Sequence, residues 1–280
     1  MSQLQNITGL SEVAGQYGVL LVDQFGTLHD GTVSYPQAAE ALRRFRESGG
    51  VVVVLSNSAK PGADNLLRLA QFGFTAEHID HVVTSGDAAQ AAIRAGKFGD
   101  AFLPGSAIHI SGKPDTDYGF GAMGFTSAWP NDAEGIILAA SQEPDRNWRE
   151  QIRDLTQAAN RGITIVVCNP DLEMLTPKGV RPSAGAIAKE LERKGADVRY
   201  FGKPHGDIYR TALAVAGNPP PMSVLAIGDS PEHDLLGAAQ VGIDGALVRT
   251  GIMTQVAEAD ILARIPRSQR RWFSLPELRW

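Results

Sequence analysis

The sequence predicts an α/β fold: a doubly wound parallel sheet core with an inserted α/β cap domain. Short, wholly apolar runs such as residues 19–22 and 51–55 alternate with helical patterns along the chain. Strands that are apolar throughout are typical of a parallel sheet that helices cover on both faces. The same alternation returns near the C-terminus, and the block between the two halves has an alternation of its own.

The N-terminal half begins with a buried strand at 19–22. Residues 35–48 predict a helix, because Pro36 falls in its first turn and two glycines follow its end. The next elements of this half are a strand at 51–57, a helix at 62–73 and a strand at 81–85.

The C-terminal half repeats the pattern. It predicts a strand at 197–201, a helix at 206–217, a strand at 223–229, a helix at 232–242 and a final strand at 244–248. The basic and aromatic tail at 264–280 is expected to pack on the surface.

The middle block predicts strands within 101–112, 133–141 and 162–169, and helices within 147–162 and 184–196. No flexible linker separates it from the two halves. We therefore assign residues 1–85 and 198–280 to the core and residues 86–197 to an inserted cap domain.

The composition limits the class of protein. The net charge of −5 argues against nucleic acid or an anionic membrane surface as a partner. The one cysteine, Cys168, excludes an intramolecular disulfide and fits a reducing cytoplasm. No apolar run approaches the ~18 residues that a membrane span needs, and the first residues do not resemble a secretory signal. We therefore expect a cytoplasmic protein.

Polar residues stand at or just after the ends of four predicted strands. They are Asp23 after the first strand, Ser56 and Asn57 at the second, Lys203 after the strand at 197–201, and Asp229 at the end of the strand at 223–229, with Asp234 near the start of the helix that follows. Each alone has an ordinary explanation as a turn former or helix cap. Ligands of open parallel sheets bind at the carboxyl ends of the strands, so their joint occurrence indicates a site.

These residue types suit phosphoryl transfer. A carboxylate nucleophile can form an aspartyl-phosphate and so divide one difficult step into two. A lysine and a hydroxyl group can neutralise and orient the phosphate oxygens. Mg²⁺ prefers a few carboxylate and carbonyl oxygens together with water and substrate phosphate, which makes Asp23 and Asp229 the candidate carboxylates.

The four segments resemble the motifs of the haloacid dehalogenase superfamily. They read DQFGTL (23–28), VLSN (54–57), GKP (202–204) and GDSPEHD (228–234). The large insertion between the second and third motifs, the stretch HDGTVSYPQAAEAL and the stretch CNPD resemble the branch of phosphatases with a large α/β cap. That branch includes nitrophenylphosphatase-like, sugar-phosphate and nucleotide phosphatases. The resemblance implies a hydrolase that acts on a small phosphorylated metabolite.

The resemblance also implies the catalytic roles. Asp23 would be the nucleophile. Ser56, with Asn57 beside it in the second motif, would hydrogen-bond the transferring phosphoryl group. Lys203 would stabilise the negative charge of that group and of Asp23.

A Mg²⁺ cofactor follows from the same resemblance. Asp23 and Asp229 would bind the ion, and Asp234 would ligate it or orient its waters. Phe25 would offer its backbone carbonyl.

Phe25 departs from the pattern of the family. In its phosphatases the residue two positions after the nucleophile is usually a second aspartate, which protonates the leaving oxygen and then activates water. Phenylalanine has no proton to exchange, and the loss of a general acid–base group costs ~10²–10⁴-fold in rate. We therefore expect an altered acid–base step.

Three explanations of Phe25 stay open. His29 titrates near neutral pH and is a candidate acid, although an exposed loop histidine is the more ordinary interpretation. Alternatively, the leaving group needs no proton, as in the superfamily's dehalogenases, which have an aromatic residue here; against this, Asp229 and Asp234 keep both acids of a Mg²⁺ site. In the third explanation the protein binds a phosphorylated ligand and catalyses little.

The insert is expected to select the substrate. Residues 169–182 predict a long polar loop between a strand and a helix, in which Asn169 and Asp171 match the family-like NPD element. Lys178 and Arg181 are candidates to meet a second anionic group of the substrate, although exposed loop charges are the more ordinary interpretation. The sequence leaves open whether the chain forms a homodimer.

Overall fold

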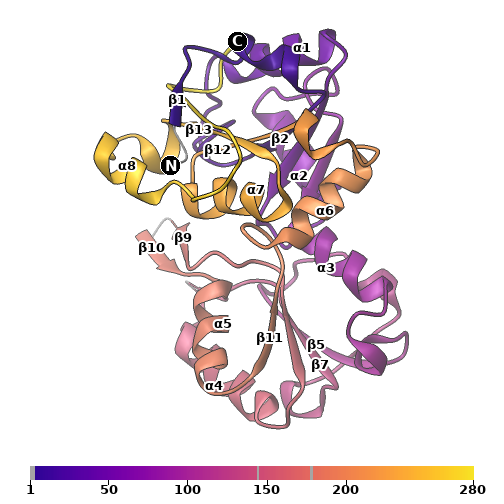
Figure 1. The fold of residues 1–280 in the computed structure, drawn as a ribbon. Coiled ribbons are helices and arrows are strands. Elements are labelled where there is room, and N and C mark those ends of the chain that lie inside the picture. The colour runs from indigo at the N-terminus through magenta and orange to yellow at the C-terminus, as the bar shows by residue number, and fades with distance from the viewer. Residues whose placement is uncertain (1–3, 144, 177–178) are drawn as a thin grey trace. The chain divides into compact units, whose positions relative to one another are not determined.

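The computed structural model describes residues 4–143, 145–176 and 179–280, and it divides into two compact units (Figure 1). The first unit comprises Met1–Ser56, Gly62–Val83 and Lys203–Trp280; the second comprises Asn57–Pro61 and Thr84–Gly202. The chain leaves the first unit and later returns to it, so the second unit is a cap-like insert. The predicted α/β fold is confirmed.

The first unit is built on a seven-stranded sheet in the order β1-β14-β13-β12-β2-β3-β4. These strands are β1 (Leu4–Asn6), β2 (Val19–Asp23), β3 (Val51–Ser56), β4 (His81–Thr84), β12 (Val224–Gly228), β13 (Asp244–Val248) and β14 (Trp272–Leu275). Every pairing from β1 across to β3 is parallel. All residues of β2 and β12 are buried, as expected of central strands in a parallel sheet that is covered on both faces.

Among its described residues the first unit has five α-helices: α1 (Ala38–Glu47), α2 (Gly62–Gln71), α6 (Gly206–Val215), α7 (Leu236–Val241) and α8 (Glu258–Arg264). Helix α1 buries Ala38, Ala41, Leu42 and Phe45, which lie on one face at helical spacing and pack into the core of this unit. A π-helical turn, Pro231–Leu235, directly precedes α7, so the helix expected at 232–242 is divided into two parts.

The second unit has a five-stranded parallel sheet in the order β11-β8-β7-β5-β6 and a separate two-stranded hairpin. The sheet strands are β5 (Ala107–Ser111), β6 (Thr126–Ser127), β7 (Gly135–Leu138), β8 (Thr164–Val167) and β11 (Asp197–Tyr200). The hairpin consists of β9 (Glu173–Thr176) and β10 (Gly179–Pro182), and the helices are α3 (Ser85–Arg94), α4 (Trp148–Ala159) and α5 (Ala184–Arg193).

Short 3₁₀ turns complete the described elements. They span Leu10–Glu12, Ala14–Gln16, Gly99–Phe102, Gly121–Met123, Pro130–Asp132, Pro221–Ser223 and Gly251–Met253.

The strand expected at 197–201 does not belong to the sheet of the first unit. It forms β11, which pairs with β8 at the edge of the second sheet, with Asp197 opposite Thr164. Its residues are only partly buried, as suits an edge strand, whereas the strands at the centre of the first sheet are wholly buried. The polar stretch expected to be a loop at 169–182 also differs, because it contains the antiparallel β9–β10 hairpin.

The C-terminal tail is not packed on the surface as expected. Its residues Trp272 and Phe273 are buried, and β14 lies in the sheet between β1 and β13. The strand at 244–248 is therefore not the last one. Arginines lie before and after β14 in the sequence, so the tail was expected to be a surface segment, although all four residues of β14 are buried.

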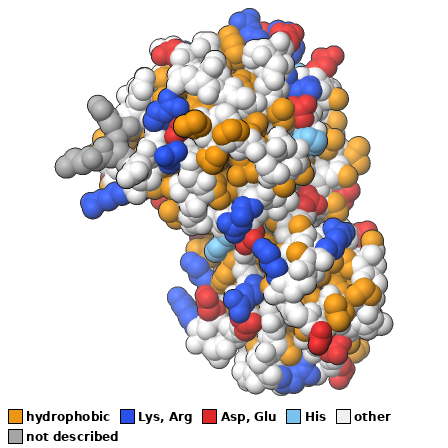
Figure 2. Space-filling view, turned by 45° about the vertical axis from the view of Figure 1, so that its right-hand side comes forward, with side chains coloured by type: hydrophobic (Ala, Val, Ile, Leu, Met, Phe, Trp, Pro, Cys, Tyr) orange, Lys and Arg blue, Asp and Glu red, His pale blue; other side chains and the backbone are white. Residues whose placement is uncertain are grey.

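The described part of the chain has no helix of the length and apolarity that a membrane crossing requires. Basic, acidic and hydrophobic side chains are interspersed on the face of the molecule that Figure 2 shows.

Candidate active site

The register of the first sheet brings the ends of its central strands together. Val22 of β2 lies opposite Ile227 of β12, and Asp23 lies opposite Leu55 of β3. Asp23 therefore ends its strand beside the residues that end β3 and β12. This is the edge of a parallel sheet at which ligands bind.

Three carboxylates gather at this edge. Asp23, Asp229 and Asp234 each have a carboxylate oxygen within 4.8 Å of the others, and the three residues are only 9%, 5% and 3% exposed. Buried like charges at this separation disfavour one another's ionised form. We call these three residues the carboxylate cluster.

Lys203 supplies the positive charge inside the cluster. Its ammonium group donates to Oδ1 of Asp23 and, over 2.8 Å, to Oδ1 of Asp234. Burial opposes the charge of Lys203, but these two carboxylates outweigh burial and raise the pKa of its ammonium group well above the usual range.

One lysine does not balance three carboxylates. Burial, with the charges of Asp234 and Asp229, raises the pKa of Asp23 well above its usual range, against the opposing effect of Lys203. Burial and the charge of Asp234 raise the pKa of Asp229 to about 7. The cluster therefore holds more negative charge than the protein compensates, and a cation would relieve that excess.

Local structure fixes Asp234. The π-helical turn returns its carboxylate to the preceding strand end, where the backbone N–H of Ser230 donates to Oδ2 over 3.0 Å. A side chain on Gly228 would overlap that carboxylate, so the last residue of β12 must be glycine. The hydroxyl of Tyr209 donates to the carbonyl of Asp234 over 3.0 Å.

The donor set fits Mg²⁺, because carboxylate oxygens are the ligands that this ion prefers and the cluster carries uncompensated negative charge. The backbone of the loop after β2 is the candidate source of a carbonyl ligand. This loop turns tightly: Leu28 N–H donates to Gln24 O over 3.0 Å, and Gly26 N–H donates to His29 O over 2.8 Å.

Phe25 is exposed in this loop, with 48% of its surface accessible, and its ring meets the ring of His29 edge to face. His29 itself is only 1% exposed and stacks on Phe72 at a centroid distance of 4.1 Å. The interpretation of His29 as an exposed loop histidine is therefore wrong.

The position of His29 also disfavours it as the acid. The backbone N–H of Gly31 donates to its Nδ1 over 2.9 Å, and its Nε2 lies 3.2 Å from the side-chain nitrogen of Gln24. Burial, together with the charge of Arg68, lowers the pKa of His29 to about 4. At neutral pH the ring is therefore uncharged and has no acidic proton to give.

Ser56 ends β3 in the first unit, whereas the next residue, Asn57, belongs to the second unit. The amide of Asn57 donates to Oδ1 of Asp171 over 2.7 Å, and Asn169 accepts from the backbone N–H of Asp171 over 3.0 Å. Asn57, Asn169 and Asp171 thus form a connected group inside the second unit, and the carboxylate of Asp171 is engaged with a protein partner.

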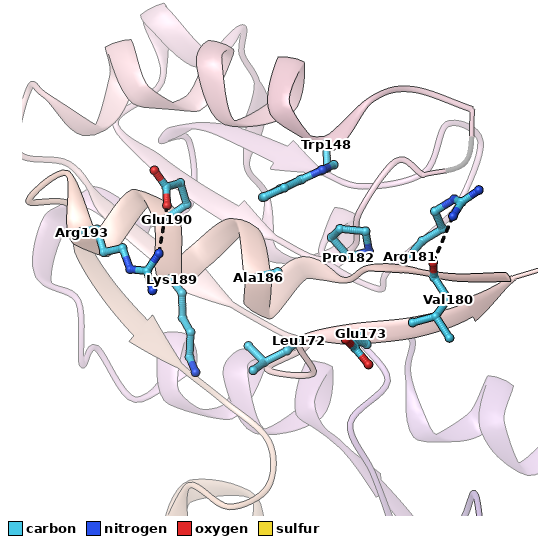
Figure 3. A pocket seen from close by; sticks show the side chains of 10 residues that line it. All are labelled: Trp148, Leu172, Glu173, Val180, Arg181, Pro182, Ala186, Lys189, Glu190 and Arg193. Atoms are coloured by element: carbon cyan, nitrogen blue, oxygen red, sulfur yellow. Dashed lines mark hydrogen bonds and ion pairs between the residues drawn. The ribbon is translucent and has the colours of Figure 1, made fainter.

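Arg181 lies elsewhere in the second unit, on β10, and lines a cavity of about 370 Å³ between the hairpin, α5 and the start of α4 (Figure 3). The ring of Trp148 closes one side of this cavity, and Lys189 and the Glu190–Arg193 pair come from α5. Lys178 lies outside the described residues.

One contact to the cluster comes from a segment that the sequence did not single out. The backbone N–H of Ile252, in the loop after β13, donates to Oδ2 of Asp229 over 2.8 Å. Ile252 contributes only its backbone to this bond, and the acceptor is the side chain of Asp229. The only available sequence signal was the position of the segment just after a strand of the sheet.

Comparison with protein families gives two matches. A model described as haloacid dehalogenase-like hydrolase matches residues 20–125, and one described as HAD-hydrolase-like matches residues 200–268. A curated relative, an acid sugar phosphatase of Staphylococcus aureus, is 23% identical over 241 residues, which cover 85% of this chain and 89% of the relative.

Solved structures share the fold. A haloacid dehalogenase-like hydrolase from Brucella suis superposes with a TM-score of 0.80 at 24% identity, covering 97% of this chain and 99% of that one. A p-nitrophenyl phosphatase from Archaeoglobus fulgidus gives 0.74 at 21% identity, covering 94% and 97%. A glycerol phosphate phosphatase from Mycobacterium tuberculosis in complex with magnesium gives 0.72 at 24% identity, covering 92% and 75%.

Proposed function

Because the chain belongs to the haloacid dehalogenase-like hydrolases, we propose that it is a Mg²⁺-dependent phosphatase that hydrolyses a small phosphomonoester through an aspartyl-phosphate. The observation that carries the proposal is the carboxylate cluster around Lys203 at the carboxyl end of the sheet. The names of the similar proteins, which act on sugar phosphates, nitrophenyl phosphate and glycerol phosphate, support this substrate class.

In the proposed reaction a carboxylate oxygen of Asp23 bonds to phosphorus while the bond to the leaving oxygen breaks. Water then attacks the same phosphorus, and Asp23 leaves as a carboxylate. Lys203 favours the ionised form of Asp23 and offers positive charge to the phosphoryl oxygens. Ser56, at the end of the neighbouring strand, is the proposed hydrogen-bond donor to the phosphoryl group.

Mg²⁺ would be held by Asp23, Asp229 and the carbonyl of Phe25, with Asp234 as a ligand or as an acceptor for its waters. When bound, the ion would neutralise and orient the substrate phosphate. The structure of the relative in complex with magnesium supports this choice of metal.

The proposed acid–base step differs from that of the usual phosphatase because Phe25 stands two residues after Asp23. The neutral, buried His29 does not replace the missing acid. We therefore expect the rate to depend strongly on how easily the leaving group departs as an anion. Aryl phosphates should react faster than alkyl phosphates.

We propose that the second unit, as the cap, selects the substrate. Asn169, Asp171, Lys178 and Arg181 remain the proposed contact residues. Arg181 lines a cavity, and its guanidinium, which donates to the carbonyl of Val180 over 3.1 Å, has further N–H groups for a second anionic group of the substrate. Asp171 is bonded to Asn57.

The test is a series of phosphomonoesters whose leaving groups differ in acidity, assayed for phosphate release with and without Mg²⁺. The variants are Phe25→Asp and, as the matched control without a titratable proton, Phe25→Asn. We expect a steep dependence on leaving-group acidity in the wild type. Phe25→Asp should raise kcat on alkyl phosphates by about 10²-fold, and Phe25→Asn should not.

Three results would contradict the proposal. A rate in the wild type that is independent of leaving-group acidity would show that another acid is present. No phosphate release from any ester, together with halide release from a haloacid, would favour a dehalogenase. Tight Mg²⁺-dependent binding of the esters without turnover would favour a binding protein.

A further inference from the structure

The loop after β13 contacts the carboxylate of Asp229 and the backbone carbonyl of Gly26. We propose that the residues of this loop, Thr250, Gly251 and Ile252, position that carboxylate and the backbone around Gly26 for the cation. This inference rests on the proposed function, because it requires a divalent cation at the carboxylate cluster. Strand β13 lies next to β12 in the sheet. The residues after its carboxyl end therefore lie beside Asp229, which follows β12.

Ile252 acts through its backbone. Its N–H donates to Oδ2 of Asp229 over 2.8 Å, while the residue is 54% exposed. A hydrogen bond to an ionised carboxylate is stronger than one between neutral groups. The bond from Ile252 restricts the rotation of the Asp229 carboxylate.

Gly251 and Gly26 enclose the same carboxylate. Both have positive φ, +54° and +84°, and a side chain on either would overlap Oδ2 of Asp229. The carboxylate is thus packed between two glycine backbones and bonded to the N–H of Ile252. A ligand group restricted in this way is oriented before the cation arrives.

Thr250 contacts the loop after β2, which carries the proposed backbone ligand. Its hydroxyl donates to the carbonyl of Gly26 over 2.6 Å, and the N–H of Gly26 donates to the carbonyl of His29 over 2.8 Å. Gly26 directly follows Phe25, whose carbonyl is the proposed backbone ligand. The hydroxyl of Thr250 therefore fixes the peptide next to that ligand.

One short loop thus orients a carboxylate after β12 and the backbone after β2, although Thr250 and Gly26 are 224 residues apart in the chain. None of its three residues is a proposed ligand, nucleophile or proton donor. Its variants should therefore change the affinity for Mg²⁺, and they should leave the identity of the nucleophile unchanged.

The experiment measures the Kd of Mg²⁺ by calorimetry on the full chain, with the Tm in Mg²⁺-free buffer measured beside it. Thr250→Val removes the hydroxyl donor and Thr250→Ser keeps it. Ile252→Pro removes the N–H, and Ile252→Ala keeps it. Proline suits the φ of a 3₁₀ turn, and Ile252 lies within one. Gly251→Ala adds the atom for which there is no room.

We expect Thr250→Val and Ile252→Pro each to raise the Kd of Mg²⁺ by about 10-fold, and Gly251→Ala by up to about 100-fold, as for other groups that orient metal ligands. Thr250→Ser and Ile252→Ala should stay within about 2-fold of the wild type, because each retains its donor.

Unchanged Mg²⁺ affinity in Thr250→Val and Ile252→Pro would overturn the inference. A lower Tm with unchanged Kd would also overturn it, because the loop would then serve stability alone. If one of these variants does not fold, the other pair decides. The wild-type titration by itself separates the two proposals: no Mg²⁺ binding there overturns the proposed function together with this inference.

Discussion

The carboxylate cluster of the first unit and the cavity beside the β9–β10 hairpin of the second unit both contain acidic and basic side chains, but those of the cluster are buried and those at the cavity are largely exposed. Lys203 forms an ion pair with Asp234, and the side chain of each is only 4% exposed. At the cavity, Arg193 forms an ion pair with Glu190, and 78% of the Arg193 side chain is exposed. Burying charges is costly, and exposed pairs contribute little to stability. The buried group is therefore far stronger evidence of a site than the exposed one.

Asp23→Asn should produce the largest effect. Loss of the nucleophile should lower kcat by at least about 10⁴-fold in a phosphate-release assay. The fold should survive, because the substitution removes one of three mutually repelling carboxylates. Asp260→Asn, on exposed α8, is the matched control and should leave kcat unchanged. If Asp23→Asn works as well as the wild type, the chemistry lies outside the cluster.

Lys203→Met should lower the free energy of unfolding by about 3–5 kcal/mol in Mg²⁺-free buffer, because it leaves buried carboxylates without their partner. Added Mg²⁺ should restore part of this loss. Urea unfolding with and without Mg²⁺ measures both effects, and Lys189→Met at the exposed cavity should change neither. Equal losses for the two lysines would remove the distinction between the two regions.

His29 should make stability depend on pH. Its pKa of about 4 in the folded protein lies below the ordinary 6.5, so the unfolded chain takes up a proton first as the pH falls. Its contribution is fully present above pH 6.5 and is lost as the pH falls towards 4. The loss should be about 2 kcal/mol relative to His29→Gln, measured by urea unfolding across this range. A constant difference between the two proteins would contradict the buried, neutral ring.

The Asn57–Asp171 bond should show the smallest effect. A double-mutant cycle of Asn57→Ala and Asp171→Ala should give a coupling of about 1 kcal/mol in the free energy of unfolding, since the pair is only partly buried. Additive effects of the two substitutions would show that this bond contributes nothing to the second unit. Asp171 would then be free to contact a ligand.

Much of the fold could be predicted from local pattern. The apolar runs that form β2, β3 and β12 could be recognised from the sequence alone. A strand that is buried on both faces has apolar side chains along its length, which gives a continuous apolar run. Strand β11 was assigned to the wrong sheet, because a half-buried edge strand has no such signature and its partner β8 cannot be read from its own residues.

Part of the candidate site was predictable in the same way. Asp23 and Asp229 each come directly after an apolar strand, and the parallel arrangement then places them at one edge. The burial of His29 was not predictable, since it depends on Phe72, a distant residue that stacks on its ring. The bond from the backbone N–H of Ile252 to Asp229 could not be predicted either, because every residue except proline has an N–H and the identity of residue 252 therefore gives no signal.

The sequence by itself determined which residue types follow which strands, and therefore which kind of chemistry this chain is equipped for. Only the tertiary structure decided that β14 enters the first sheet, that His29 is enclosed, and that the loop after β13 holds the carboxylate of Asp229. The physical reason is range: strand and turn preferences act between neighbours in the chain, whereas burial and backbone contacts depend on segments that only folding brings together.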